Sequence, residues 1–176
     1  MSLIKKLGRG LQNFLRKIIR KLESLKGNNR SIADGFATGA AVSFTPFVGF
    51  HLIIALIWAK IMKQNGVAAA LGTIVGNPWT FPLIWYADLH LGKIILIRET
   101  AEDKIDFIDL FKELFHCVIM LDFGRFFSDI YPVFMPMLVG SIPFCIVIWF
   151  LCAHLVLGIL KSKTENGGKN DTGIRM

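Results

Sequence analysis

Three long stretches of this chain contain no Asp, Glu, Lys or Arg, and they limit the possible fold more than any other feature. They cover residues 35–59, 64–87 and 130–160. Each is long enough to cross a hydrocarbon layer of about 30 Å, which needs about 20 apolar residues in a helix. The whole chain is 53% hydrophobic and only 19% charged, which excludes an ordinary soluble enzyme. The pattern therefore predicts an all-α membrane protein with three to four spans.

Prolines interrupt the first two stretches near their middles. The interruptions divide two predicted segments, residues 33–59 and residues 66–87. They centre on four helix-breaking residues, Pro46, Gly49, Pro78 and Pro82. A proline removes a backbone hydrogen bond that lipid cannot replace, so the freed carbonyl groups must meet protein or water. Each broken segment is therefore either a kinked helix or a re-entrant hairpin, and the sequence favours the two equally.

Small residues precede each break at helical spacing. Gly35, Gly39 and Ser43 are four residues apart, and Gly72 and Gly76 repeat this spacing. Such a face lets a second helix approach closely. Paired broken segments surround the substrate site in many transporters. We therefore expect the two breaks to meet near the middle of the membrane.

The first 30 residues combine a basic surface with an apolar stripe. Apolar residues recur at steps of three and four from Leu3 to Leu25, which predicts an amphipathic helix. We expect this helix to lie in the headgroup layer of the cytoplasmic leaflet. A mitochondrial transit peptide or a coiled-coil seam would show part of the same pattern. The residues assigned to lipid headgroups are Lys5, Lys6, Arg9, Arg16, Lys17, Arg20 and Lys21.

The rest of the chain is assigned to one membrane domain and a tail. Residues 31–160 form the domain, and its last part, residues 130–160, is the C-terminal span. Apolar and acidic residues alternate with helical periodicity near 105–121, which predicts a surface helix over residues 103–121. The Asn- and Gly-rich residues 161–176 are predicted to be a disordered tail.

Residues 31–92 carry a resemblance to a known family. The motifs are Ala-x-Gly-Phe-Ala-x-Gly from Ala33, then Pro46, Gly49 and His51, and above all Gly-Asn-Pro-Trp-Thr from Gly76. In these motifs the chain resembles Domain of Unknown Function 2062, a family of small bacterial integral membrane proteins. The resemblance implies an inner-membrane location, a compact multi-span fold and occasional fusion to glycosyltransferases that use lipid carriers. It implies no activity, cofactor or catalytic residue.

Polar and ionisable groups inside apolar stretches are costly, so they are the candidate functional residues. His51 and Asn77 lie beside the two breaks, where they either face a bound anion or satisfy free backbone groups. The candidates for substrate binding or structural polar contacts are His51, Asn77, Thr80, Asp34, Asp88 and His90. The sequence contains no catalytic motif or metal-ligand spacing, so no catalytic residue, metal or other cofactor is assigned. The cysteines Cys117, Cys145 and Cys152 are interpreted as apolar core residues.

Two functions fit these patterns. The first is binding or transport of a small anionic or lipid-phosphate substrate at the paired broken helices, by a homo-oligomer in the bacterial inner (plasma) membrane. The second is a non-catalytic scaffold for a membrane glycosyltransferase. An enzyme is less favoured, because no complete catalytic set is visible. Since basic residues concentrate in the first 30 positions, the net charge of +7 is assigned to membrane lipids rather than nucleic acid, with the N-terminus cytoplasmic.

Overall fold

The fold is helical throughout the described part of the chain. This computed structural model describes residues 2–47, 49–77, 80–97, 116 and 131–172. Within those ranges the chain forms six α-helices and one short 3-10 helix, with no strand. The all-α prediction is therefore confirmed for these residues. The predicted surface helix over residues 103–121 lies outside the described residues, apart from His116.

The helices from α2 to α5 correspond to the first two uncharged stretches and are separated where those stretches are interrupted. Their bounds are α1 Ser2–Glu23, α2 Asn29–Val42, α3 His51–Ile61, α4 Gly66–Gly72, the 3-10 helix η1 Thr73–Val75, α5 Phe81–Ile95 and α8 Tyr131–Thr172. The first stretch thus divides into α2 and α3, and the second into α4 with η1 and then α5. Each half is shorter than a full membrane crossing, since even the 15 residues of α5 span only about 22 Å.

α8 is the longest helix and continues without interruption through Pro136 and Pro143. Its part from Tyr131 to Lys163 is long and apolar enough to cross a membrane, and no other described helix meets that test of length and composition. The sequence predicts a disordered tail from residue 161, whereas α8 continues to Thr172.

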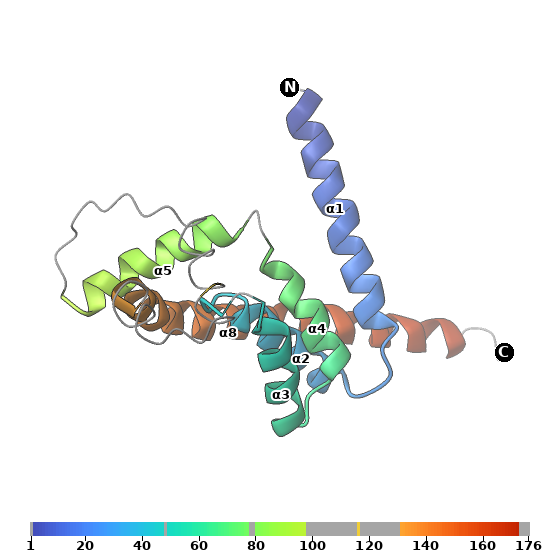
Figure 1. Cartoon of the computed structure of the whole chain (residues 1–176). Coiled ribbons are helices and arrows are strands. Elements are labelled where there is room, and N and C mark those ends of the chain that lie inside the picture. The colour runs from blue at the N-terminus through green and yellow to red at the C-terminus, as the bar shows by residue number, and fades with distance from the viewer. Residues whose placement is uncertain (1, 48, 78–79, 98–115, 117–130, 173–176) are drawn as a thin grey trace.

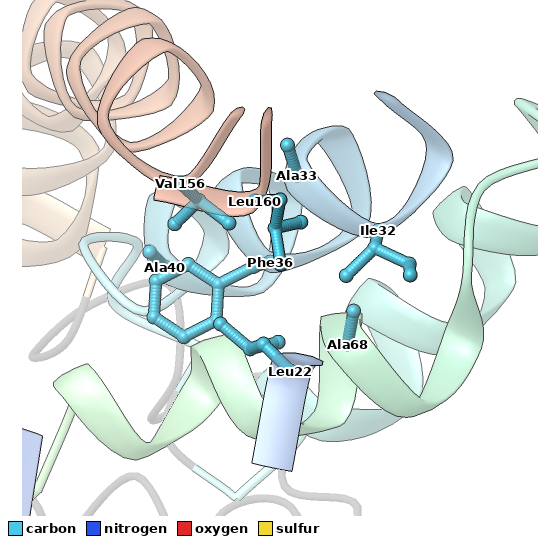
Figure 2. Packing of buried hydrophobic residues seen from close by; sticks show 8 residues of the cluster. All are labelled: Leu22, Ile32, Ala33, Phe36, Ala40, Ala68, Val156 and Leu160. Atoms are coloured by element: carbon cyan, nitrogen blue, oxygen red, sulfur yellow. The ribbon is translucent and has the colours of Figure 1, made fainter. Parts of the chain in front are cut away.

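α2 packs along the middle of α8, from Cys145 to Leu160. The largest hydrophobic cluster lies here and joins α1, α2, α4 and α8 (Figure 2). Its buried members are Leu22, Ile32, Ala33, Phe36, Ala40, Ala68, Val156 and Leu160. At the start of this part of α8, the Cys145 thiol donates a hydrogen bond to the Ala41 carbonyl oxygen at 3.1 Å. The start of α2 therefore lies beside the end of α8, and the two helices are antiparallel.

α5 packs along the N-terminal half of α8 (Figure 1). A second hydrophobic cluster joins them through Ile84, Trp85, Leu89 and Met137. The backbones also touch, because a Cβ atom at Gly92 would overlap the Pro136 carbonyl group and one at Gly140 would overlap the Asp88 carbonyl group. This pairing makes α5 antiparallel to α8 as well. α2 and α5 therefore follow one another along α8, with the end of α2 and the start of α5 beside its middle.

Glycines bring α2 and α4 into direct backbone contact. A Cβ atom at Gly39 would overlap the Ala69 carbonyl oxygen, and one at Gly72 would overlap the Phe36 carbonyl oxygen. The close helix approach predicted from the four-residue spacing of small residues is therefore confirmed. Its effect is to hold the second broken segment against the first.

α1 points away from the long axis of α8 and joins the core through its C-terminal end (Figure 1). Leu22 is only 2% exposed, whereas Phe14 and Leu15 are 46% and 48% exposed. Five of the predicted headgroup-binding side chains are exposed on this helix: Arg9, Arg16, Lys17, Arg20 and Lys21. Lys5 and Lys6 also lie within α1. The apolar side chains of Phe14 and Leu15, before the docked end, are therefore largely uncovered.

Candidate functional site

The two helix breaks meet in one junction beside the middle of α8. Ser43, the C-cap of α2, donates from Oγ to the Gly39 carbonyl oxygen at 3.0 Å and lies 3.2 Å from the Thr73 carbonyl oxygen. Gly76 sits between the two segments, since a Cβ atom there would lie 2.7 Å from Ser43 Cβ and 3.0 Å from Phe81 Cε1. The end of α2, the end of η1 and the start of α5 are thus in contact.

Asn77 and Thr80 bond to each other reciprocally in the turn that leads into α5. Asn77 Oδ1 accepts a hydrogen bond from the Thr80 backbone N–H at 3.2 Å. Thr80 Oγ1 accepts one from the Asn77 backbone N–H at 3.0 Å and lies 3.0 Å from the Val75 carbonyl oxygen. The two side chains bond as in a capping box, but they satisfy the backbone N–H groups of this turn and not those of the first turn of α5. The arrangement supports the structural alternative for Asn77.

His51 begins α3 and faces the same junction. Its ring lies edge-on to the Phe81 ring, with centroids 6.0 Å apart, and Phe81 in turn stacks on Trp85 at 5.9 Å. His51 Nδ1 is buried at this contact. The contact joins the first broken segment to the second, while the side-chain oxygen of Asn77 is directed to Thr80.

Asp88 is fully buried where α5 crosses α8. It is 0% exposed, and neither carboxyl oxygen has a hydrogen-bond partner among the described residues. The neighbouring hydroxyl on α8, that of Ser141, donates instead to the Leu138 carbonyl oxygen at 2.8 Å. Asp88 therefore occupies an apolar contact with no compensating donor.

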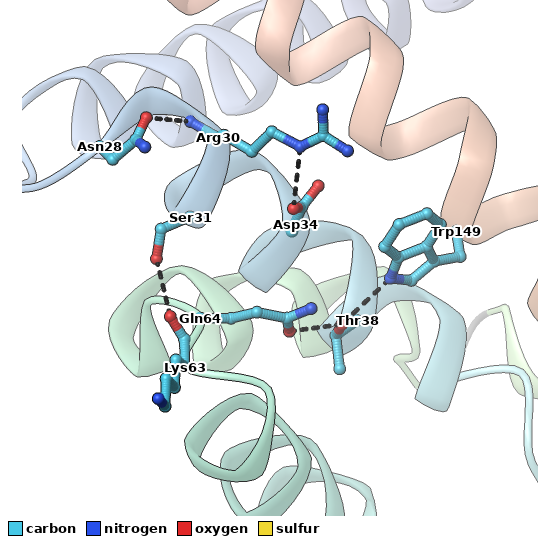
Figure 3. A network of polar contacts seen from close by, with 8 residues as sticks. All are labelled: Asn28, Arg30, Ser31, Asp34, Thr38, Lys63, Gln64 and Trp149. Atoms are coloured by element: carbon cyan, nitrogen blue, oxygen red, sulfur yellow. Dashed lines mark hydrogen bonds and ion pairs between the residues drawn. The ribbon is translucent and has the colours of Figure 1, made fainter.

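Two other predicted site residues make local contacts. Asp34 on α2 forms an ion pair with Arg30, with 3.5 Å between Oδ2 and Nε, and its side chain is 21% exposed (Figure 3). His90 is exposed on α5, and its ring stacks on that of Tyr86 with centroids 6.0 Å apart. Neither residue joins the junction contacts described above.

The predicted helix-breaking residues have different surroundings. Pro46 is buried just after the end of α2. Gly49 adopts a φ of +85°, in the left-handed region that favours glycine, and lets the chain turn into α3. Pro82 lies in the first turn of α5, where a proline removes no intrahelical hydrogen bond. Pro78 falls outside the described residues.

A groove of about 410 Å³ opens between α2, α3 and α8. It is lined by Thr38, Ala41, Val42, Ile54, Trp58, Cys145, Ile146, Trp149 and Phe150. Three of these, Trp58, Ile146 and Phe150, are more than half exposed, at 53%, 54% and 54%. The groove is therefore an apolar trough that opens on the outer surface of the helices.

A polar network joins the groove to the turn between α3 and α4 (Figure 3). Trp149 donates from Nε1 to Thr38 Oγ1 at 3.1 Å, and Thr38 Oγ1 donates to Gln64 Oε1 at 2.7 Å. Close by, Ser31 Oγ lies 3.3 Å from the Lys63 carbonyl oxygen. The network thus places one end of the groove beside a turn that carries basic side chains.

One family profile matches residues 12–166 and so includes parts of all six helices. The family is described as "uncharacterized protein conserved in bacteria" (DUF2062). The chain belongs to the DUF2062 family. No curated protein and no solved structure matches the chain. The DUF2062 match brings no activity with it, so function must be argued from the geometry.

Three polar residues of this DUF2062 protein were not singled out from the sequence, namely Thr38, Gln64 and Trp149. They come from α2, the α3–α4 turn and α8, and they meet only through tertiary packing. The available signal was weak: Thr38 is a hydroxyl inside a face of small residues, and Gln64 ends a short polar turn. Spacing along the chain cannot connect them.

Proposed function

We propose that this protein is a multi-pass protein of the bacterial inner membrane and binds a phosphate-bearing lipid, with the lipid chain in the groove between α2, α3 and α8. The groove is the observation that carries the proposal, because this open space of about 410 Å³ is lined almost entirely by apolar side chains. A hydrocarbon chain entering sideways from a bilayer would pass from lipid to Trp58, Ile146 and Phe150 without losing its apolar surroundings.

The outer surface of the helices supports a membrane setting. Large apolar side chains are exposed on α3, α5 and α8, among them Ile61 at 66%, Leu83 at 73% and Val147 at 61%. Monomeric soluble proteins rarely leave large contiguous apolar patches exposed. In a bilayer the same side chains would meet hydrocarbon. Because α2 and α5 are each too short to cross alone, we propose that they form a broken second crossing beside α8.

The positions of the basic residues support a cytoplasmic N-terminus. The start of α2, the α3–α4 turn and the end of α8 come together through the contact of Ser31 with Lys63 and the shared cluster of Ile32 with Leu160. Lys163 at this end also pairs with Glu23 of α1. Lys and Arg concentrate on the cytoplasmic side of membrane proteins. We therefore assign this end to the cytoplasm, with α1 along the headgroup layer.

The same end of the groove suits a phosphate group. Lys60 in the last turn of α3 and Lys63 on the α3–α4 turn are exposed, and Arg30 lies at the start of α2. The turn is next to the Thr38–Gln64–Trp149 network. Basic side chains near a membrane surface attract anionic headgroups by about 1 kcal/mol each. The lipid chain would lie along the groove, with its phosphate toward these basic residues.

Binding is tested with the detergent-solubilised protein and a short polyprenyl phosphate, followed by native mass spectrometry. The variant Ile146→Trp fills the groove and should weaken binding about tenfold, which corresponds to about 1.4 kcal/mol. Val147→Trp is the matched control, because Val147 is exposed on α8 and does not line the groove. Equal binding by both variants, or no binding by the wild type, would contradict the proposal.

Headgroup selectivity is tested by comparing the polyprenyl phosphate with the alcohol of the same chain length. We expect the phosphate to bind more tightly and Lys63→Gln to reduce this preference. The competing proposal is a scaffold for a lipid-carrier glycosyltransferase. That proposal gains support if the protein captures such an enzyme from native membranes while both lipids fail to bind.

A further inference from the structure

We propose that Asp88 is a proton-binding site, which holds a proton while α5 is packed on α8 and releases it when that contact opens to water. The ligand is the proton itself, bound by a single carboxyl group. This inference goes beyond lipid binding and does not rest on it, because the groove and Asp88 share no described hydrogen bond and Asp88 is not a groove residue.

The first support is the complete burial of an unpartnered carboxyl group. Asp88 is 0% exposed, and both of its oxygen atoms lack a donor among the described residues. Moving an isolated ionised carboxylate into an apolar environment costs far more than protonating it. In the packed arrangement the neutral acid is therefore the stable form.

The second support comes from the groups that face this carboxyl. Cys145 of α8 is near enough to interact with an Asp88 charge, but its thiol donates to the Ala41 carbonyl oxygen. The Ser141 hydroxyl is bonded within α8, to Leu138. His51 of α3 reaches α5 at Phe81, about two helical turns before Asp88. None of these contacts supplies the carboxyl with a cation or a donor.

The charged residues of α2 are engaged elsewhere. Arg30 and Asp34 pair with each other near the start of α2, whereas α5 begins beside its end. Among the described residues, no group of three or more His, Cys, Asp and Glu side chains could hold a metal ion. One carboxyl group without further ligands can bind a proton but not a divalent cation.

The third support is the way α8 covers the site. Gly140 lies directly against the Asp88 carbonyl group, and Gly92 against that of Pro136, so the two helices touch at backbone level. Separation of α5 from α8 would bring water to the carboxyl and allow it to ionise. The ionised form would then resist repacking, since burial would again remove its solvation. Proton binding and helix contact are thus linked.

The test is infrared spectroscopy of the purified full-length protein in a detergent that lacks carbonyl groups. At pH 7 an exposed aspartate or glutamate is ionised and gives no protonated-carboxyl band. We expect the wild type to show such a band and Asp88→Asn to lose it. Asp34→Asn is the matched control and should keep the band, because Asp34 is partly exposed and paired with Arg30.

A second measurement uses the unaltered sequence and so does not depend on the folding of a variant. Labelling aspartate with carbon-13 should shift the band, and transfer to heavy water should shift it again as the proton exchanges. Titration toward high pH should abolish the band. Absence of an aspartate band at pH 7 would show that Asp88 is ionised, and a band that neither exchanges nor titrates would show a fixed structural acid. Either result would overturn the proposal.

Discussion

Two parts of α8 carry different kinds of helix contact. Where α2 packs on it, from Cys145 to Leu160, the polar side chains are partnered: Trp149 with Thr38, Thr38 with Gln64, and Cys145 with the Ala41 carbonyl. Along the N-terminal half, α5 buries the Asp88 carboxyl with no partner. Fully satisfied polar groups fix one arrangement, whereas a buried unpartnered carboxyl weakens the packed state. The comparison suggests a fixed α2–α8 contact and an α5–α8 contact that can change.

The largest loss of stability is expected from a substitution that pushes the backbones of α5 and α8 apart. Gly140→Ala places a methyl group on the Asp88 carbonyl, and we expect it to lower the free energy of unfolding by about 3 kcal/mol. Gly158→Ala is the control on the same helix, because a Cβ atom there meets nothing within 4 Å. Thermal unfolding in detergent measures both. Equal melting temperatures for the two variants would show that the α5–α8 crossing is wider than described.

A polar-to-apolar change should destabilise the α2 side. Thr38→Val removes the hydroxyl shared by Trp149 and Gln64 and leaves two half-buried polar groups without that partner. We expect a loss of about 2 kcal/mol. Denaturation followed by tryptophan fluorescence would measure it. Thr38→Ser keeps the hydroxyl and should retain most of the stability, whereas an equal loss in both variants would assign the effect to packing.

On the α5 side, a polar-to-apolar substitution should stabilise the protein instead of destabilising it. Asp88→Val removes a buried carboxyl that has no partner, and we expect it to raise the free energy of unfolding by about 1 kcal/mol. The gain should grow as the pH rises, because the wild type keeps its proton when packed and loses it when unfolded. Thermal unfolding between mildly acid and mildly alkaline pH tests this. A destabilised Asp88→Val would mean that the carboxyl has a favourable partner in the folded protein.

The smallest expected change in stability comes from a substitution at the junction of the two helix breaks. Asn77→Ala removes the side-chain acceptor of the Thr80 N–H and should cost about 1 kcal/mol. Asn77→Asp keeps the acceptor and should stay near the wild type. Lipid binding should be unchanged in both, because Asn77 does not line the groove. Loss of binding with unchanged stability would instead assign Asn77 to the ligand.

Local features of this fold could be predicted from the sequence. The uncharged stretches, their interruptions and the small faces at Gly35, Gly39 and Gly72 all act within a few residues, and α2, α4 and α5 follow them. The contact of Asn77 with Thr80 is of the same kind, since the two residues are three positions apart. Such contacts depend on spacing that the chain displays directly.

Features that depend on long-range packing could not be predicted. Nothing in the spacing shows that α2 and α5 follow one another along α8, or that Thr38 meets Trp149 from α8. Cys145 was interpreted as an apolar core residue, yet its thiol bonds to a backbone carbonyl that becomes a neighbour only after folding. Pro136 and Pro143 lie inside α8, and the helix nevertheless continues through both of them. In a long helix, packing can compensate for the bond that a proline removes.

The position of α8 after α2 and α5 in the chain has a consequence for biosynthesis. Both half-helices α2 and α5 pack on α8, yet the ribosome makes α8 after both of them. Until α8 has been synthesised, the short apolar helices of the two broken segments and the Asp88 carboxyl therefore remain uncovered. We expect a chain released before residue 131 to be degraded rapidly in cells, and supplying residues 131–176 as a separate polypeptide to restore its lifetime.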